Sequence, residues 1–257
     1  RRIWWKFVIN LAILFLVTSH SPASAPDNIT ALYLPSHCFT ERKIEEFVHY
    51  AKLAGINAAV LHVKDPHGRI RWKSSNVQAA EVGAVASTGL VESTLRQLKA
   101  QGFWTVAKLD VFADHQLVTK RPDLGIIDIQ SEDPWSDRKG LYWSNPFNQK
   151  VWEYNLALCK ELVMLGFDEI QFDYIRFPSD GDLSAIQYPL NTGQLNKTQC
   201  IGKFLESAHA KLKPMGATIS VDLFGMVAWK TVDFGVGQVI ETIAPYVDVI
   251  CPMLYPS

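Results

Sequence analysis

A regular alternation of short apolar segments with longer amphipathic segments constrains the fold of this chain more than any other feature. Segments typical of buried strands lie at residues 29–34, 57–63, 103–109, 168–174, 218–223 and 247–253. Helical patterns separate most of them, at residues 41–53, 91–100, 149–165, 194–212 and 239–243. Alternating strands and helices predict a parallel sheet covered by helices, because parallel neighbours need long crossover connections.

Six such units favour a (β/α)8 TIM barrel over a dinucleotide-binding fold, since no glycine-rich phosphate loop follows the first strand. A chain of 257 residues suits one barrel domain, which we expect over residues 26–257. The sixth predicted strand ends just before Ser257. We therefore expect a barrel that is C-terminally incomplete, without strands seven and eight. An open six-stranded sheet is the alternative.

The first 25 residues have the pattern of a secretory signal peptide. Arg1, Arg2 and Lys6 precede an apolar run at residues 7–17, and Ala-Ser-Ala at residues 23–25 provides a cleavage site. We expect cleavage after Ala25 and a location outside the cell or in its envelope. An uncleaved anchor is the alternative, and contact with a membrane is expected only in that case.

Composition excludes several kinds of partner. The formal net charge is −1 and there is no basic stripe, so we do not expect nucleic acid to bind. Histidine and cysteine spacings match no metal motif, so neither a metal nor another cofactor is expected. Export would permit a disulfide between Cys38 and Cys200, but no pattern favours that pairing.

The predicted strand at residues 168–174 carries acidic side chains on one face. Glu169, Gln171 and Asp173 share one parity of the strand, and the residues between them are mainly apolar. The polar set is expected to point into the barrel, with Asp173 at the carboxyl end of the strand, where TIM barrels have their active sites. Arg176 follows closely and is expected to pair with a carboxylate there.

A second carboxylate ends the next strand. Asp222 shares the parity of Ser220, so it is expected to face Asp173 across the barrel mouth. Carboxyl groups about 5 Å apart suit a retaining glycosidase, whereas roughly 6.5–9.5 Å suits an inverting one.

Further candidate residues follow the ends of the other strands and the long segment at residues 110–148. We expect them to bind substrate through charge, hydrogen bonds or stacking on sugar rings. They are Lys64, Asp65, Lys108, Trp135, Trp143 and Tyr255. A structural role in turns or core is the alternative for each of them.

Three strings resemble a bacterial family that is known mainly as a domain of unknown function and assigned to the glycoside hydrolases. They are GFDEIQFDYIRFP at residues 166–178, VKDPHG at 63–68 and PMLYPS at 252–257, and the resemblance spans residues 29–257. That family is distantly similar to α-amylase and dextranase-like glycosidases. The resemblance implies a TIM barrel that acts on polysaccharide, with Asp173 as nucleophile and Asp222 as the nearest candidate acid/base. The string AKLDVF at residues 107–112 departs from the pattern, which has an arginine and no acid there.

Three functional hypotheses follow. The first is an exported glycosidase that cleaves an extracellular or envelope polysaccharide with the Asp173 and Asp222 pair. The second is a catalytically inactive barrel that only binds glycan. The third is a lyase or aldolase in which Lys64 forms a Schiff base.

Overall fold

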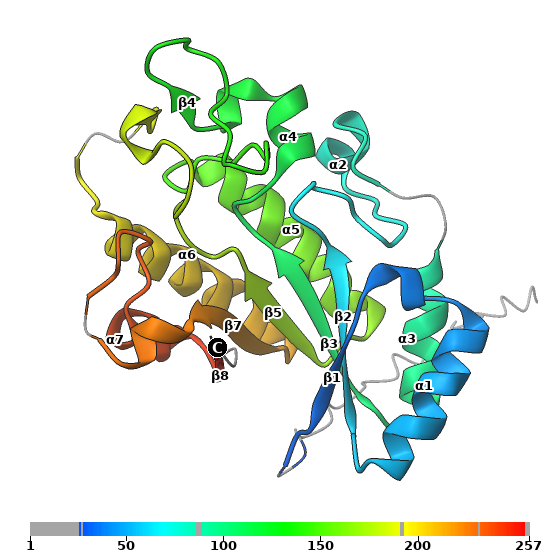
Figure 1. Cartoon of the computed structure of the whole chain (residues 1–257). Helices are drawn as coiled ribbons and strands as arrows, with labels where there is room; N and C mark the ends of the chain where they lie inside the picture. Colours follow the sequence, from blue (N-terminus) through cyan, green and yellow to red (C-terminus); the bar gives the residue numbers. More distant parts are fainter. Residues whose placement is uncertain (1–25, 27, 86–88, 191–192, 231, 255–257) are drawn as a thin grey trace, which may run out of the picture.

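The computed structural model describes residue 26 and residues 28–85, 89–190, 193–230 and 232–254. Over these residues the chain is mixed α/β, with one parallel sheet and helices packed against it (Figure 1). The strands of that sheet are β1 (Ala31–Leu34), β2 (Ala58–Lys64), β3 (Trp104–Asp110), β5 (Glu169–Asp173), β7 (Thr218–Phe224) and β8 (Val249–Met253). The predicted signal peptide lies outside the described residues.

The longer helices lie where the amphipathic pattern predicts them. They are α1 (Glu41–Leu53), α3 (Leu90–Ala100), α5 (Gln149–Leu165) and α6 (Lys197–Leu212), with the single turn α7 (Ile240–Ile243) before β8. Helix α5 ends as expected at Gly166, whose φ of 103° is in the left-handed region that glycine adopts without strain. Helix α6 begins with a capping box between Asn196 and Gln199.

The strand order decides between the predicted architectures. The sheet runs β1-β2-β3-β5-β7-β8, and every neighbouring pair is parallel. The strands of this sheet therefore lie side by side in the order in which they occur in the chain. A doubly wound sheet would reverse its order at a switch point. The six strands instead curl into a half-barrel with the helices outside, which confirms an incomplete TIM barrel (Figure 1). Over the described residues β1 and β8 are the two edges of the sheet.

The main hydrophobic core lies between the sheet and the helices. Phe204 of α6 packs edge-on against Phe172 of β5, Phe112 after β3 and Trp152 of α5. A smaller apolar cluster on the inner face of the sheet contains Ala58, Trp104 and Val106. The inner face is therefore apolar near the amino ends of β2 and β3, whereas β5 places Glu169 on that face at its first residue.

The loops after the strands contain short elements that the sequence pattern did not predict. They are α2 (Val77–Glu81), α4 (His115–Lys120) and an antiparallel pair formed by β4 (Ile127–Asp128) and β6 (Ile186–Gln187). The pair joins the long loop after β3 to the loop after β5. Such loops carry the variable parts of a barrel's active face.

Two further sequence expectations are tested by the structure. Cys38, Cys159, Cys200 and Cys251 are all free thiols, so the disulfide permitted between Cys38 and Cys200 is not formed. In the part of the chain that the structure describes, no helix is both long and apolar enough to cross a membrane.

Candidate active site at the strand ends

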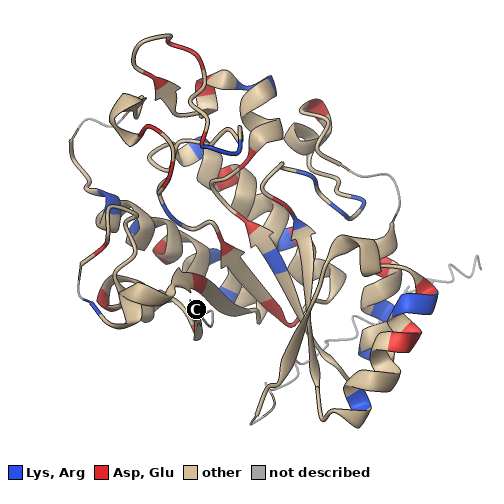
Figure 2. Ribbon diagram, in the orientation of Figure 1, with Lys and Arg blue, Asp and Glu red and all other residues tan. Residues whose placement is uncertain are grey.

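Three carboxylates form a row at the carboxyl ends of three adjacent strands. Asp110 of β3 is in register with Asp173 of β5. The β5–β7 register pairs Phe172 with Val221, so Asp173 and Asp222 are neighbours one step further along. All three continue the inward parity of Lys108, Gln171 and Ser220 one level below. Figure 2 shows acidic and basic positions close together near the tips of these strands.

Lys108 joins two of these carboxylates. Its Nζ donates to Asp222 Oδ2 at 2.6 Å and forms a second short ion pair with Asp173 Oδ2. The three side chains are only 9–15% exposed. Because one nitrogen contacts both oxygens, the two oxygens lie no more than about 5 Å apart, close to the spacing typical of a retaining pair. The structure thus brings together Asp173, Asp222 and Lys108.

Burial and charge set the protonation of this group. Burial raises the pKa of Asp222 to about 6; Lys108 opposes that rise and the charge of Asp173 adds to it. Burial alone would lower the pKa of Lys108, but the two carboxylates outweigh it and raise that pKa. Gln171 Nε2 donates to Asp222 Oδ1 at 2.8 Å, which orients the carboxyl group. Asp222 is therefore suited to hold a proton at pH values up to about 6.

The inner face below this group is also polar. Glu169 Oε2 accepts a hydrogen bond from Trp104 Nε1 at 2.9 Å. Among the described residues, Gln171 Oε1 and Ser220 Oγ are buried without a hydrogen-bond partner. Unsatisfied buried acceptors are costly, and their presence beneath carboxylates is typical of a functional centre.

Asp110 has a different partner. Its Oδ2 lies 3.2 Å from His62 Nε2, and His62 Nδ1 lies 2.8 Å from the hydroxyl of Tyr33. Asp110 is fully buried, and burial raises its pKa while the hydrogen bond from His62 opposes the rise. His62 and Tyr33 were not among the predicted site residues, although the parity of β1 and β2 places both on the inner face.

The prediction that Lys64 binds substrate is wrong. The β2–β3 register shifts between His62 and Lys64, so Lys64 pairs with Leu109 and takes the outward parity. Its ammonium group lies behind the sheet, 2.8 Å from Asp114 Oδ2, 2.6 Å from the carbonyl of Asp110 and 3.2 Å from Asn155 Oδ1. Because it is fully buried and has these partners, it is not placed to form a Schiff base with a carbonyl substrate.

Asp65 lies in a turn and is bound by its neighbours. Its Oδ2 accepts from Arg71 at 2.6 Å and its Oδ1 from the backbone N–H of Arg69. The turn brings Gly68 against Asp114, where a Cβ atom would meet Asp114 Oδ1 at 2.1 Å. The site that Asp65 occupies is therefore a structural turn, the alternative left open by the sequence.

The two loop tryptophans are not available for stacking on sugar. Trp143 is 1% exposed and its indole N–H donates to Asp137, while that of Trp135 donates to the carbonyl of Asp182. Both rings pack within the loops that follow β3 and β5, so the expected sugar platform is wrong for them. Among the described residues, the exposed indole ring is that of Trp229, which is 77% exposed and follows β7 in the chain.

Arg176 lies at the mouth but does not pair with a carboxylate as expected. Its guanidinium group stacks 4.7–5.0 Å from the rings of Phe224, Trp143 and Tyr174. Its Nη1 donates to the carbonyl of Phe177 and to Ser179 Oγ. Burial lowers its pKa. Lys108 has instead taken the role of the cation beside the acids. Tyr255, the remaining predicted contact, lies outside the described residues.

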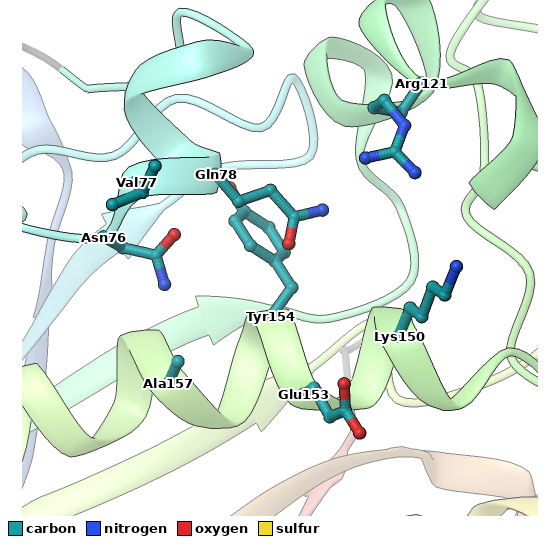
Figure 3. A pocket seen from close by; sticks show the side chains of 8 residues that line it. All are labelled: Asn76, Val77, Gln78, Arg121, Lys150, Glu153, Tyr154 and Ala157. Carbon is teal, nitrogen blue, oxygen red and sulfur yellow. The ribbon is translucent and has the colours of Figure 1, made fainter.

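A surface pocket of about 460 Å³ lies apart from the strand ends, between α2 and the first turns of α5. Figure 3 shows Tyr154 rising from α5 towards Gln78, with Arg121 and Lys150 at one side. None of its lining residues belongs to the acidic row. The strand-end side chains, and not this pocket, therefore define the candidate active site.

Comparison with known proteins identifies the family of the chain. A family model described as "Putative glycosyl hydrolase domain" matches residues 31–257. A hypothetical protein from Ruminiclostridium thermocellum is 32% identical, with a TM-score of 0.68 over 74% of this chain and 96% of that one. No curated protein matches the chain.

More distant structures share the fold. The glycoside hydrolase domain of PgaB (BpsB) from Bordetella bronchiseptica has a TM-score of 0.65 at 12% identity, over 88% of this chain and 74% of that one. The exo β-N-acetylglucosaminidase from Vibrio harveyi, solved with N-acetylglucosamine, has a TM-score of 0.59 at 13% identity. The match covers 88% of this chain and 41% of that enzyme.

The position of Lys64 gives a test of stability. Replacing Lys64 with Met leaves Asp114 buried without its cation, so we expect the free energy of unfolding to fall by about 3–5 kcal/mol. Urea denaturation followed by tryptophan fluorescence measures this. Lys203→Met is the matched control, since Lys203 pairs with Glu206 on an exposed helix face, and no measurable loss is expected there. Equal stability of the two variants would contradict the buried pair.

Proposed function

Because the chain belongs to this family of glycosyl hydrolase domains, we propose that it hydrolyses O-glycosidic bonds in an extracellular or cell-envelope polysaccharide. Asp173 acts as the nucleophile and Asp222 as the general acid and base. The observation that carries the proposal is the pair of inward carboxylates, side by side at adjacent strand ends and held by one lysine.

The two carboxyl groups differ in the way that a retaining mechanism needs. Asp222, with its pKa raised to about 6, donates a proton to the leaving oxygen while ionised Asp173 attacks the anomeric carbon. Water then replaces Asp173 at that carbon, and Asp222 takes the proton of the water. A separation of no more than about 5 Å leaves no space for a water between the two groups, which favours retention of configuration.

Lys108 has a definite task in this scheme. It neutralises part of the charge of two neighbouring carboxylates, and it opposes the rise in the pKa of Asp222 that burial and the charge of Asp173 cause. Its contact with Asp173 occupies the position from which the carboxylate would reach a sugar. Substrate must therefore displace the Lys108 ammonium group from Asp173 while leaving it on Asp222.

The same contact favours a second candidate function. If Lys108 stays on both carboxylates, the barrel binds glycan without cleaving it. Release of reducing ends distinguishes the two functions, because a binding module gives a complex and no product.

The test of the main proposal uses a panel of 4-nitrophenyl glycosides and soluble polysaccharides. The wild type should release reducing ends from at least one member, with the anomeric configuration retained in the first product seen by proton NMR. Asp173→Asn should lower the rate on that substrate at least about 10³-fold, because the nucleophile is lost. Circular dichroism should show the fold unchanged.

Asp123→Asn is the matched control, since Asp123 is an exposed carboxylate paired with Arg121 far from the row. It should keep full activity. Turnover by Asp173→Asn at the wild-type rate would sink the assignment of the nucleophile. Glycan binding with no released reducing ends from the wild type would favour the binding module.

The pKa of Asp222 predicts the pH profile. A general acid must be protonated, so kcat/KM should be high below pH about 6 and fall as the pH rises through that value. Lys108 lowers the pKa of Asp222, so Lys108→Met should move this alkaline limb to higher pH while lowering the rate. Carbon-13 NMR of the Asp222 carboxyl group gives the same comparison if turnover is too slow. A limb that stays in place in Lys108→Met would contradict the assignment of Asp222.

Action outside the cytoplasm is also part of the proposal, and it rests on the basic, apolar and small-residue pattern of residues 1–25. Expression of the whole chain in a secreting bacterial host should give an extracytoplasmic protein that begins at Pro26. N-terminal sequencing measures this. A protein retained in the cytoplasm with residue 1 intact would exclude export.

A further inference from the structure

A second polar group lies on the inner face, on the β1 side of the carboxylate row. Tyr33 of β1 is in register with Val60, so it shares the inward face with His62 two positions further along β2. His62 is in register with Lys108, and Asp110 with Asp173. Tyr33, His62 and Asp110 therefore lie beside the proposed catalytic pair, on three adjacent strands.

With Asp110 ionised and His62 neutral, the hydrogen bonds of this group have one direction. An ionised carboxylate offers only lone pairs, so Asp110 Oδ2 accepts and His62 Nε2 carries the hydrogen, over 3.2 Å. In the neutral ring Nδ1 is then unprotonated and accepts the hydroxyl hydrogen of Tyr33 over 2.8 Å. A hydroxyl group that has donated its hydrogen still has lone pairs to offer. This series of hydrogen bonds thus ends at Tyr33 Oη, which can accept a further hydrogen bond.

Exposure increases along this chain of hydrogen bonds. The Asp110 side chain is 1% exposed and that of His62 is 17% exposed, while Tyr33 is 47% exposed. The buried end is the carboxylate, and the more exposed end is a hydroxyl on β1, an edge strand of the described sheet. A buried carboxylate often fixes the tautomer of a histidine in this way. The tautomer in turn decides whether the residue on the other side of the histidine donates or accepts a hydrogen bond.

We propose that Tyr33 is a substrate-binding residue whose hydroxyl oxygen accepts a hydrogen bond from a sugar hydroxyl, with His62 and Asp110 as its positioning residues. This subsite rests on the proposed function, and it extends that function by assigning the β1 side of the mouth to a neutral, hydroxyl-bearing sugar ring. Asp110 itself does not touch the substrate, because it is fully buried.

The free-energy cost of burying Asp110 supports a functional role for this residue. Its Oδ1 is buried and has no hydrogen-bond partner among the described residues, so Asp110 is only half satisfied. Burying a polar atom without a hydrogen-bond partner costs free energy of folding. The sheet does not need it for register, because backbone pairing already joins β1, β2 and β3 over their length. The hydrogen-bond chain to Tyr33 is what Asp110 adds to this part of the sheet.

Binding tests the proposal separately from turnover. The parent is Asp173→Asn, screened on an immobilised array of polysaccharides and oligosaccharides, and the dissociation constant is then measured in solution for the glycan that it binds most tightly. Adding Tyr33→Phe removes one hydroxyl group and should raise that constant about three- to tenfold. Tyr50→Phe is the matched control, since Tyr50 is 67% exposed on α1, in the outer helix layer. It should leave the constant unchanged.

Nitrogen-15 NMR of the imidazole tests the positioning role. His62 should be the Nε2–H tautomer, with Nδ1 accepting a hydrogen bond, and its signals are identified by their loss in His62→Gln. Tyr33→Phe should shift the Nδ1 resonance towards that of a free acceptor. Asp110→Asn should change the tautomer ratio and raise the glycan dissociation constant, whereas an Asp110–His62 hydrogen bond with a purely structural role would leave that constant unchanged.

The outcomes separate this subsite from the hydrolytic function. A dissociation constant within twofold of the parent in Tyr33→Phe, a protonated Nδ1 in His62, or an array on which no glycan binds would overturn the subsite. If the constant rises but the wild type releases no reducing ends, the subsite stands and the hydrolytic proposal fails. If the wild type releases reducing ends and Tyr33→Phe leaves the dissociation constant unchanged, the hydrolytic proposal stands and the subsite fails.

Discussion

The ion pairs of Lys108 are the interactions on which the inner face of this sheet depends. Three carboxylates on adjacent strand ends would repel one another in a site with little water. One ammonium group contacts Asp173 and Asp222 together, and the third acid, Asp110, is bound by His62 instead. The row therefore divides into a charged pair and a hydrogen-bonded chain, and these two halves have different chemistry.

The fold supplies this division by simple geometry. Parallel strands in register place every second side chain of adjacent strands at one level, so residues far apart in sequence form layers. Apolar side chains fill the lowest layer, and the acidic row ends the highest. Outside the sheet, the buried pair of Lys64 and Asp114 joins the end of β2 to the beginning of α4, which keeps the loops above the row in place.

Several parts of the site were predictable from the sequence and others were not. The parity of β5 and β7 was enough to predict that Asp173 and Asp222 face inward together. Lys64 was a candidate because of its place at a strand end, but a register shift in β2 gives this last residue the outward parity. Trp135 and Trp143 were candidates because of their place in a long loop, but the burial of a loop aromatic depends on which loops pack over it. Trp229, which stands exposed, carries no local signal that separates it from them.

The sequence by itself determined the order of strands and helices, the inward parity of the acidic residues and their place at the strand ends. These follow from local periodicity, which each segment carries on its own. Only the tertiary structure decided which partners those acids take. Lys108 pairs with both carboxylates, Arg176 stacks on aromatic rings instead, and Tyr33, His62 and Asp110 form one chain. Such contacts join residues on different strands, and their geometry exists only once the sheet has set the register.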